Sequence, residues 1–126
     1  RILLDKDFEE KDLHLLNGEI PTIVFSNRSN HKKPNLEFIQ LDFSKDIHTQ
    51  ILTELYSRDI QSVIIEGGRT LLQSFIDLNL WDEARVLVGE TSFGKGVKAP
   101  ILGLTRQHSF QFHSDWVYVF KNYKVC

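Results

Sequence analysis

The chain has 126 residues, of which 41% are hydrophobic and 25% charged, and its formal net charge is -2. This length suits one domain with its own core, and the near-neutral charge argues against the broad basic surface typical of nucleic-acid binding. The single cysteine, Cys126, excludes a disulfide framework within the chain and favours a reducing compartment. No apolar run has the length of a membrane span, so we expect a cytoplasmic protein without a membrane partner.

The first third of the chain predicts three strands, at residues 1–5, 22–26 and 36–41, because each is a short, largely apolar run. Asn17 and Gly18 indicate a turn before the second strand. The basic stretch 28–33 is interpreted as a solvated loop. The chain begins at Arg1 directly on an apparent core strand, which we interpret as a sign that it is a piece of a longer polypeptide.

A helix follows, with Ser44 as the expected N-cap and Ile47, Ile51 and Leu55 at helical spacing on one face. It is expected to end near residues 58–59. Residues 60–65 are β-branched and apolar, which predicts a strand buried on both faces. Strand, helix and strand of these lengths predict a βαβ unit with parallel strands and a right-handed crossover.

Glu66, Gly67 and Gly68 stand between that expected strand and the next amphipathic helix. The first N–H groups of a helix have no partner within the helix, so such a turn can bind an anion. Glu66, at the carboxyl end of the strand, is expected to project into the crevice where open α/β sheets bind ligands. The alternative is that the glycine pair only makes a tight connection, since the G-x-G-x-x-G fingerprint is absent. The pattern leaves both interpretations open.

The last third predicts a helix whose apolar face carries Leu71, Leu72, Phe75 and Ile76, and then a strand at residues 83–88. Residues 89–103 hold four of the seven glycines and predict a long loop, in which Lys95 and Lys98 are interpreted as solvated. Residues 109–113 and 116–123 predict two antiparallel strands. The sum is a mixed, mainly parallel sheet with flanking helices and a C-terminal antiparallel hairpin.

Other familiar chemistry is not indicated by the sequence. None of the five histidines has the spacing of a helical metal site, so no metal is expected. Cys126, at the very end of the chain, is a poor candidate for a nucleophile. The residues alone therefore predict an α/β domain with one candidate anion-binding turn, and they do not define a reaction.

An ordered series of motifs carries a resemblance to a known family. Glu66-Gly67-Gly68 is followed by a helix, by Leu80-Trp81-Asp82-Glu83, by a strand and by a glycine loop, while Ile2 to Asp5 and Ser114-Asp115-Trp116 fit the first strand and the final turn. In this order the segments resemble the C-terminal reductase domain of the bifunctional riboflavin biosynthesis protein RibD. The resemblance covers nearly the whole chain.

The resemblance implies a dihydrofolate-reductase-like fold and NADPH-dependent reduction of 5-amino-6-(5-phosphoribosylamino)uracil to the ribitylamino product. Glu66 is then expected to bind this small-molecule substrate. The implied cofactor-binding residues provide backbone amides at the start of the helix, with the Thr70 and Ser74 hydroxyls as extra donors; they are Gly68, Arg69, Thr70, Leu71, Leu72, Gln73 and Ser74. Lys6 occupies a position that often contacts NADPH in the family, where Ser is frequent.

The chain also departs from the family pattern. Family reductase domains extend upstream of the strand that matches Ile2 to Asp5, and that part holds a first strand and an Asp with a catalytic or binding role. Residues 1–126 are therefore expected to be the C-terminal part of a single reductase domain, inactive alone and without an assignable catalytic residue. The family commonly forms a homodimer through this domain. Two alternatives stay open: a non-catalytic nucleotide-binding or assembly domain of the same fold, and a related enzyme for another pterin or pyrimidine.

Overall fold

The structure is a computed structural model that describes residues 1–9, 13–28, 30–103 and 105–123, so Cys126 lies outside the described residues. The chain divides into two compact units, Arg1–Val63 and Ile64–Cys126. Each unit has its own sheet and one α-helix, and each is described by itself below.

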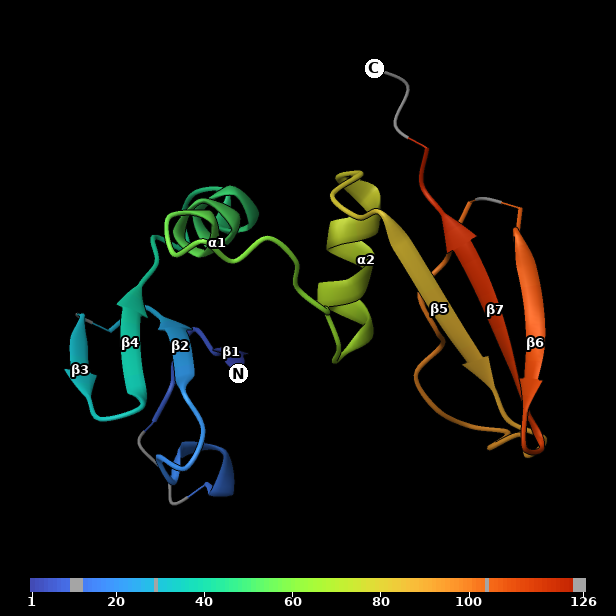
Figure 1. Ribbon diagram of the computed structural model, residues 1–126, viewed down its shortest axis with the longest axis horizontal. Coiled ribbons are helices and arrows are strands. Elements are labelled where there is room, and N and C mark those ends of the chain that lie inside the picture. The colour runs from blue at the N-terminus through green and yellow to red at the C-terminus, as the bar shows by residue number, and fades with distance from the viewer. Residues whose placement is uncertain (10–12, 29, 104, 124–126) are drawn as a thin grey trace. The chain divides into compact units, whose positions relative to one another are not determined.

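Unit 1 is built on a four-stranded sheet in the order β1-β2-β4-β3 (Figure 1). The strands β1 (Ile2–Leu4), β2 (Thr22–Ser26) and β4 (Leu36–Gln40) are parallel neighbours, with Leu3 opposite Val24 and Val24 opposite Phe38. All three strands predicted from the first third of the chain are thereby confirmed. β2 is buried along nearly its whole length because it lies between two other strands and carries apolar side chains on both faces.

The interpretation of residues 28–33 as a solvated loop is wrong in its second half. β3 (His31–Lys33) is an antiparallel edge strand that pairs with β4, with Lys32 opposite Glu37. Asn35 adopts a left-handed conformation with φ of 54° in the tight connection between the two strands. Pro34 and Asn35 are a turn signal, and exposed lysines are typical of a protected edge strand. The charged composition of residues 28–33 did not indicate either the edge strand or the turn that follows it.

Helix α1 (Ile47–Tyr56) is confirmed, but its N-cap is Asp46 rather than Ser44. The Asp46 carboxylate accepts a hydrogen bond of 3.0 Å from the His48 amide and another from the Thr49 hydroxyl. The Ser44 hydroxyl instead donates to Asp42. Both residue types cap helices well, and Asp46 is the one that stands directly before the first helical residue, Ile47.

Two apolar clusters form the core of unit 1, one on each face of the sheet. On one face, Ile51 and Leu55 of α1 pack against Phe25, Ile39 and Leu41. On the other face, Phe8 packs against Val24, Leu36 and Phe38, with partly buried Leu3 and Leu16 beside them. Leu16 belongs to a short 3-10 helix, η1 (His14–Leu16), in the connection from β1 to β2.

The strand predicted at residues 60–65 is absent, and the βαβ prediction that depended on it is wrong. These residues have no regular secondary structure, and the Ile64 side chain is 86% exposed. A strand is stabilised by backbone hydrogen bonds to a neighbour, and no strand in the described ranges pairs with this segment. The division between the two units falls inside it, after Val63.

Unit 2 begins with helix α2 (Arg69–Asp77), whose Phe75 is buried as expected for its apolar face. The strands β5 (Glu83–Val88), β6 (His108–Phe112) and β7 (Asp115–Lys121) form an antiparallel sheet in the order β5-β7-β6. The predicted hairpin is therefore confirmed, and β5 joins it as a third strand. Residues 89–103 form the predicted long loop without regular structure.

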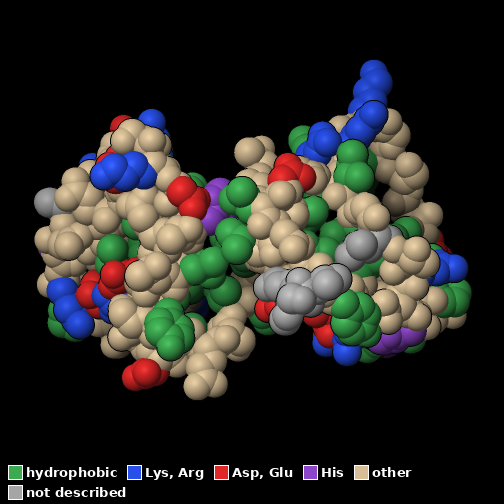
Figure 2. All heavy atoms as spheres, turned by 90° about the horizontal axis from the view of Figure 1, so that it is seen from above, with side chains coloured by type: hydrophobic (Ala, Val, Ile, Leu, Met, Phe, Trp, Pro, Cys, Tyr) green, Lys and Arg blue, Asp and Glu red, His purple; other side chains and the backbone are tan. Residues whose placement is uncertain are grey.

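The predicted fold class is confirmed: a mixed, mainly parallel sheet, two helices and a C-terminal antiparallel sheet. Among the described residues, no helix is both long enough and apolar enough to cross a membrane. On the face drawn in Figure 2, hydrophobic side chains reach the surface between charged ones. In unit 2, Leu87, Phe93 and Phe112 are more than half exposed.

Candidate functional site

The Glu66-Gly67-Gly68 turn lies directly before α2, as predicted. Gly67 has φ of 130°, a conformation that side chains other than hydrogen rarely adopt. Gly68 is the N-cap of α2, with φ of -69° and ψ of 154°, and no side chain caps the helix. A Cβ built on either glycine meets no atom within 4 Å. The turn therefore leaves open space in front of the first helical amides.

The electrostatics of the α2 N-terminus suit an anion. Its first turn contains no acidic residue and begins with Arg69. The Leu72 amide donates a hydrogen bond of 3.3 Å to the carbonyl of Gly68, the N-cap residue. The amides before Leu72 have no acceptor within the helix, and they lie at the positive end of the helix dipole. A phosphate group fits this combination of open space and unused donors.

Thr70 is exposed in the first turn, whereas Leu71 and Leu72 are half-buried on the apolar side of α2. Gln73 and Ser74 are engaged elsewhere. The Gln73 side chain accepts a hydrogen bond of 2.8 Å from the Ile101 amide and donates to Asp77. The Ser74 hydroxyl donates to the Leu71 carbonyl at 2.7 Å. The Gln73 contact to Ile101 ties the long loop to α2, which the sequence did not indicate.

Glu66 is exposed at the end of the extended segment that precedes the turn. Its carboxylate makes no hydrogen bond or ion pair with any residue in the described ranges. An ionised carboxylate without a partner has all its acceptor positions available for hydroxyl or amide donors. Glu66 can thus serve the substrate-binding role expected of it, which remains a prediction.

Lys6 lies in unit 1, in the turn that follows β1. Its carbonyl accepts a hydrogen bond of 3.0 Å from the Asn27 amide, so the chain after β1 lies beside the chain after β2. The Lys6 side chain is exposed and has no ion-pair partner among the residues that the structure describes. It stands at the carboxyl ends of parallel strands, where α/β sheets bind ligands.

Arg28 was not singled out from the sequence, although it belongs to the same strand ends. It follows β2 by two residues, and its guanidinium carbon lies 5.9 Å from the centre of the Phe8 ring. Its position two residues after a buried strand was a signal that could have identified it. The basic stretch 28–33 had hidden this signal, because its lysines and histidine suggested nothing more than a solvated loop.

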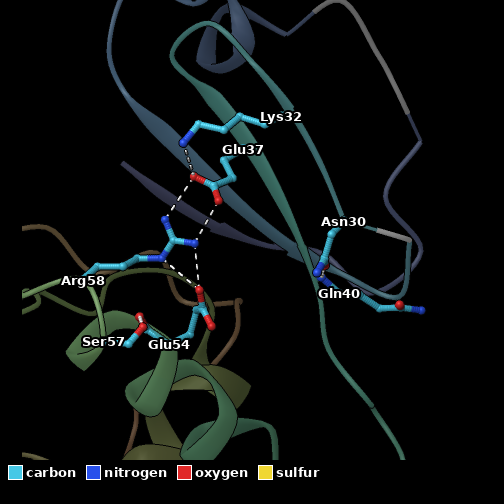
Figure 3. Close-up of polar contacts among 7 residues, drawn as sticks. All are labelled: Asn30, Lys32, Glu37, Gln40, Glu54, Ser57 and Arg58. Atoms are coloured by element: carbon cyan, nitrogen blue, oxygen red, sulfur yellow. Dashed lines mark hydrogen bonds and ion pairs between the residues drawn. The ribbon is translucent and has the colours of Figure 1, made fainter.

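A second polar group of unit 1 has a structural role. Arg58 donates to both carboxylate oxygens of Glu37, at 3.0 and 2.9 Å, and to Glu54 at 2.7 Å (Figure 3). These hydrogen bonds hold the pKa of Glu37 at about 2, with Lys32 adding to the effect and burial opposing it. A hollow of about 220 Å³ lies beside this group. Because the charges neutralise one another, the group joins α1 to the sheet rather than offering a free site.

No set of three or more His, Cys, Asp or Glu residues in the described ranges is arranged to hold a metal ion. Lys95 and Lys98 lie in the exposed loop of unit 2, as predicted. Within the described ranges, the start of α2 has amides without side-chain caps, and Lys6 is an exposed cation at the strand ends; both stay candidates for an anionic ligand.

The fold defines a class: an α/β protein of dihydrofolate-reductase-like fold, in which α2 begins directly after the glycine turn without a side-chain cap. A solved structure from Thermotoga maritima, a diaminohydroxyphosphoribosylaminopyrimidine deaminase/5-amino-6-(5-phosphoribosylamino)uracil reductase, aligns with a TM-score of 0.79. The alignment has 23% sequence identity and covers 96% of this chain and 37% of that one, and it establishes the fold.

The family follows from the sequence comparison. The model of the RibD C-terminal domain matches residues 1–118. A curated relative, the riboflavin biosynthesis protein RibD of Aquifex aeolicus (strain VF5), is 30% identical over 109 residues. That match covers 82% of this chain but 31% of the relative, so the chain spans about a third of the relative's length. The chain belongs to the RibD C-terminal domain family.

Proposed function

We propose that this chain is part of an NADPH-dependent reductase of riboflavin biosynthesis. The proposed reaction reduces 5-amino-6-(5-phosphoribosylamino)uracil to the ribitylamino product. The observation that carries the proposal is the family match over residues 1–118, which includes the Glu66-Gly67-Gly68 turn and the uncapped start of α2. Both named relatives support it, since one acts in riboflavin biosynthesis and the other is a reductase of this uracil derivative.

Each residue of the turn has a distinct part in this proposal. The amides from Gly68 to Leu71 precede the first hydrogen bond of α2, and they would bind the phosphates of NADPH. Glu66 would accept hydrogen bonds from the sugar hydroxyls of the substrate and orient the carbon that is reduced. Lys6 would add a positive charge for the cofactor. When bound, NADPH supplies the hydride, and a proton from solvent or the protein balances the reduction.

The two units are proposed to be parts of one reductase domain. The family match crosses the division between Val63 and Ile64, which supports this assignment. The relatives are about three times longer than the chain, so we expect residues 1–126 alone to be inactive. The cytoplasmic location also remains a proposal, supported by the use of one cysteine in 126 residues.

Steady-state kinetics of the full-length protein test the reaction. The loss of NADPH absorbance is followed with the uracil substrate, in the wild type and in Glu66→Gln. We expect the KM for the pyrimidine to rise about tenfold or more in Glu66→Gln, because a carboxylate acceptor is lost. The affinity for NADPH is expected to remain unchanged. Glu90→Gln, at another exposed glutamate of unit 2, is the matched control.

The outcomes separate this proposal from the alternatives. NADPH binding without oxidation in the presence of the uracil substrate would favour a non-catalytic nucleotide-binding domain. Oxidation with a dihydropterin but not with the uracil derivative would favour an enzyme for another substrate. Equal kinetic constants in Glu66→Gln and the wild type would contradict only the role of Glu66 and would leave the proposed reaction standing.

A further inference from the structure

Asn17 and Gly18 form an exposed turn that leads from η1 toward β2. Asn17 is the C-cap of η1, with φ of -67° and ψ of -5°, and Gly18 follows with φ of 77°. The Asn35 side chain donates to the Gly18 carbonyl at 3.0 Å, and the Thr22 amide donates to the Asn35 carbonyl at 2.9 Å. The turn is therefore tied to the amino ends of β2 and β4, opposite to the strand ends at Lys6.

The Gly18 amide is a potential nucleophile beside the Asn17 side chain. The backbone nitrogen that follows an asparagine can attack the side-chain carbon Cγ and close a ring. A side chain on the following residue obstructs this approach, and glycine has none. Asn17 is the only asparagine of the sequence that glycine follows. The Gly18 amide donates no hydrogen bond to any residue that the structure describes, so the attack breaks no existing bond.

The Asn17 side chain is held in a way that favours this attack. Its Oδ1 accepts a hydrogen bond of 3.1 Å from the Glu19 amide. A donor at this oxygen stabilises the negative charge that develops on it when a nucleophile adds to Cγ. The turn thus places a donor on the reacting carbonyl of Asn17 and an unbonded nitrogen directly after it.

Two other asparagines show the opposite arrangement. After Asn27, the Arg28 amide donates to the Ser26 hydroxyl at 3.2 Å. After Asn79, the Leu80 amide donates to a carbonyl of α2 at 2.9 Å. Attack by either nitrogen would break its hydrogen bond and would be obstructed by the side chain of the same residue. The structure therefore separates Asn17 from these sites.

We propose that Asn17 is a site of spontaneous deamidation. The Gly18 nitrogen gives its proton to water and bonds to Cγ of Asn17, and the Cγ–Nδ2 bond breaks with release of ammonia. Water then opens the resulting succinimide. Opening at Cγ gives aspartate, whereas opening at the α-carbonyl gives isoaspartate, whose backbone runs through the former side chain. The reaction consumes only water, and it does not depend on the proposed function.

The two products should affect the turn differently. Isoaspartate adds a methylene to the backbone just before Gly18, which displaces the carbonyl that accepts the Asn35 hydrogen bond. Loss of that bond should lower the melting temperature of the isoaspartate form. Asn17→Asp keeps the normal backbone and an oxygen acceptor for the Glu19 amide, so it should melt close to the wild type.

Peptide mass spectrometry of the full-length protein, incubated folded at mildly alkaline pH, tests the proposal site by site. We expect Asn17 to convert at least about tenfold faster than every other asparagine, a difference of little more than one kilocalorie in the barrier. The internal controls are Asn27, Asn30, Asn35, Asn79 and Asn122.

Gly18→Ala tests whether the Gly18 nitrogen is the attacking atom. A Cβ at Gly18 meets only the Pro34 carbonyl oxygen, at an ordinary contact distance of 3.7 Å. The left-handed φ disfavours alanine, so circular dichroism must first show that the variant is folded. We expect conversion of Asn17 to slow at least about tenfold, because the methyl group obstructs ring closure.

Three results would overturn the proposal. One is conversion of Asn17 at the same rate as the other asparagines in the folded protein. Another is conversion of Asn17 in urea but not in the folded protein, which would mean that the turn protects the side chain. The third is an unchanged rate at Asn17 in folded Gly18→Ala.

Discussion

Arg58 shows how one side chain joins segments that lie 21 residues apart in the sequence. Its guanidinium makes paired hydrogen bonds to Glu37 of β4 and further bonds to Glu54 of α1. The side chains of Arg58 and Glu37 are 29% and 24% exposed, so water screens the pair only in part. Geometry of this kind makes the group stronger than the isolated surface pair of Arg85 and Glu83 in unit 2.

Glu37→Gln tests the energy of this group and its dependence on pH. The pKa of Glu37 in the folded protein is about 2, against an ordinary value of 4.5, because Arg58 donates to its carboxylate. A lowered folded pKa means that the stabilisation is present above pH 4.5 and is lost as the pH falls toward 2. We expect a cost of about 1–2 kcal/mol near neutral pH, measured by urea unfolding.

The cost should disappear near pH 2, where protonated glutamate resembles glutamine. Glu19→Gln removes an exposed carboxylate of the same unit and should change the unfolding free energy by less than about 0.5 kcal/mol. A destabilisation in Glu37→Gln that stays constant from pH 7 to pH 2 would contradict the assignment, because it would arise from packing rather than from charge.

Gly68→Val separates binding from folding at the α2 turn. Gly68 has the extended conformation that valine prefers, and a Cβ there meets no atom within 4 Å. We expect the melting temperature of the full-length protein to fall only slightly, because valine is a poorer N-cap than glycine. The NADPH affinity should fall at least about a hundredfold, because the side chain occupies the phosphate position. Fluorescence titration with NADPH measures the affinity.

Gly96→Val is the matched control for Gly68→Val. Gly96 also lies in open space, in the exposed loop of unit 2, and no left-handed φ is required there. Its substitution should leave both the melting temperature and the NADPH affinity unchanged. Unchanged NADPH affinity in Gly68→Val would remove the turn from the cofactor site.

At the scale of the elements, the two helices and most strands follow from local patterns, whereas residues 60–65 do not. Their β-branched composition is typical of a buried strand, yet Ile64 is 86% exposed. Composition determines what a segment can form, but a strand exists only where another segment accepts its hydrogen bonds. The same reason explains β3, whose polar residues form a strand because β4 lies beside them.

Residues 60–65 are expected to become a strand in a protein of the relatives' full length. The additional chain would supply the neighbour that is absent from the described residues. Hydrogen–deuterium exchange compares the two forms: these amides should exchange rapidly in the 126-residue chain and at least about a hundredfold more slowly in the longer protein. The amides of β2, which are paired in the structure, serve as the reference. Equal, rapid exchange of residues 60–65 in both forms would contradict this prediction.

At the scale of the whole molecule, the exposed apolar surface of unit 2 favours the expected homodimer. Leu87 and Phe110 both lie opposite Val117 of the central strand, so the three side chains share one face of the sheet. Val117 itself is buried, but the side chains on the flanking strands are exposed: Leu87 is 68% exposed, and Phe112, two residues after Phe110 on β6, is 63% exposed. Apolar side chains gathered on one exposed face are typical of an interaction surface.

Leu87→Asp tests whether a second copy covers this face. We expect the full-length protein to sediment as a dimer and the variant to dissociate at least about tenfold more readily, since a charge would be buried in the interface. Ser109→Asp is the control, because Ser109 lies opposite Tyr118 and faces the other side of the sheet. A wild type that sediments as a monomer, or an unchanged dimer in Leu87→Asp, would exclude this face as the interface.

The sequence by itself determined the elements whose signal is local. Periodic apolar residues predicted the two helices, apolar runs predicted β1, β2, β4 and β5, and the glycine pair predicted the turn before α2. The ordered motifs also determined the family, which the comparison with the RibD C-terminal domain confirmed. These features depend on neighbours within a few residues, so they can be read along the chain.

Only the tertiary structure decided the features that depend on distant neighbours. In the folded protein the Arg28 guanidinium lies over the Phe8 ring, and Arg58 donates hydrogen bonds to Glu37 and Glu54. The strand β3 pairs with β4, and β5 joins the C-terminal hairpin as a third strand. Each of these contacts requires two segments to meet in space, and the energy that brings them together comes from burying the shared core rather than from either segment alone.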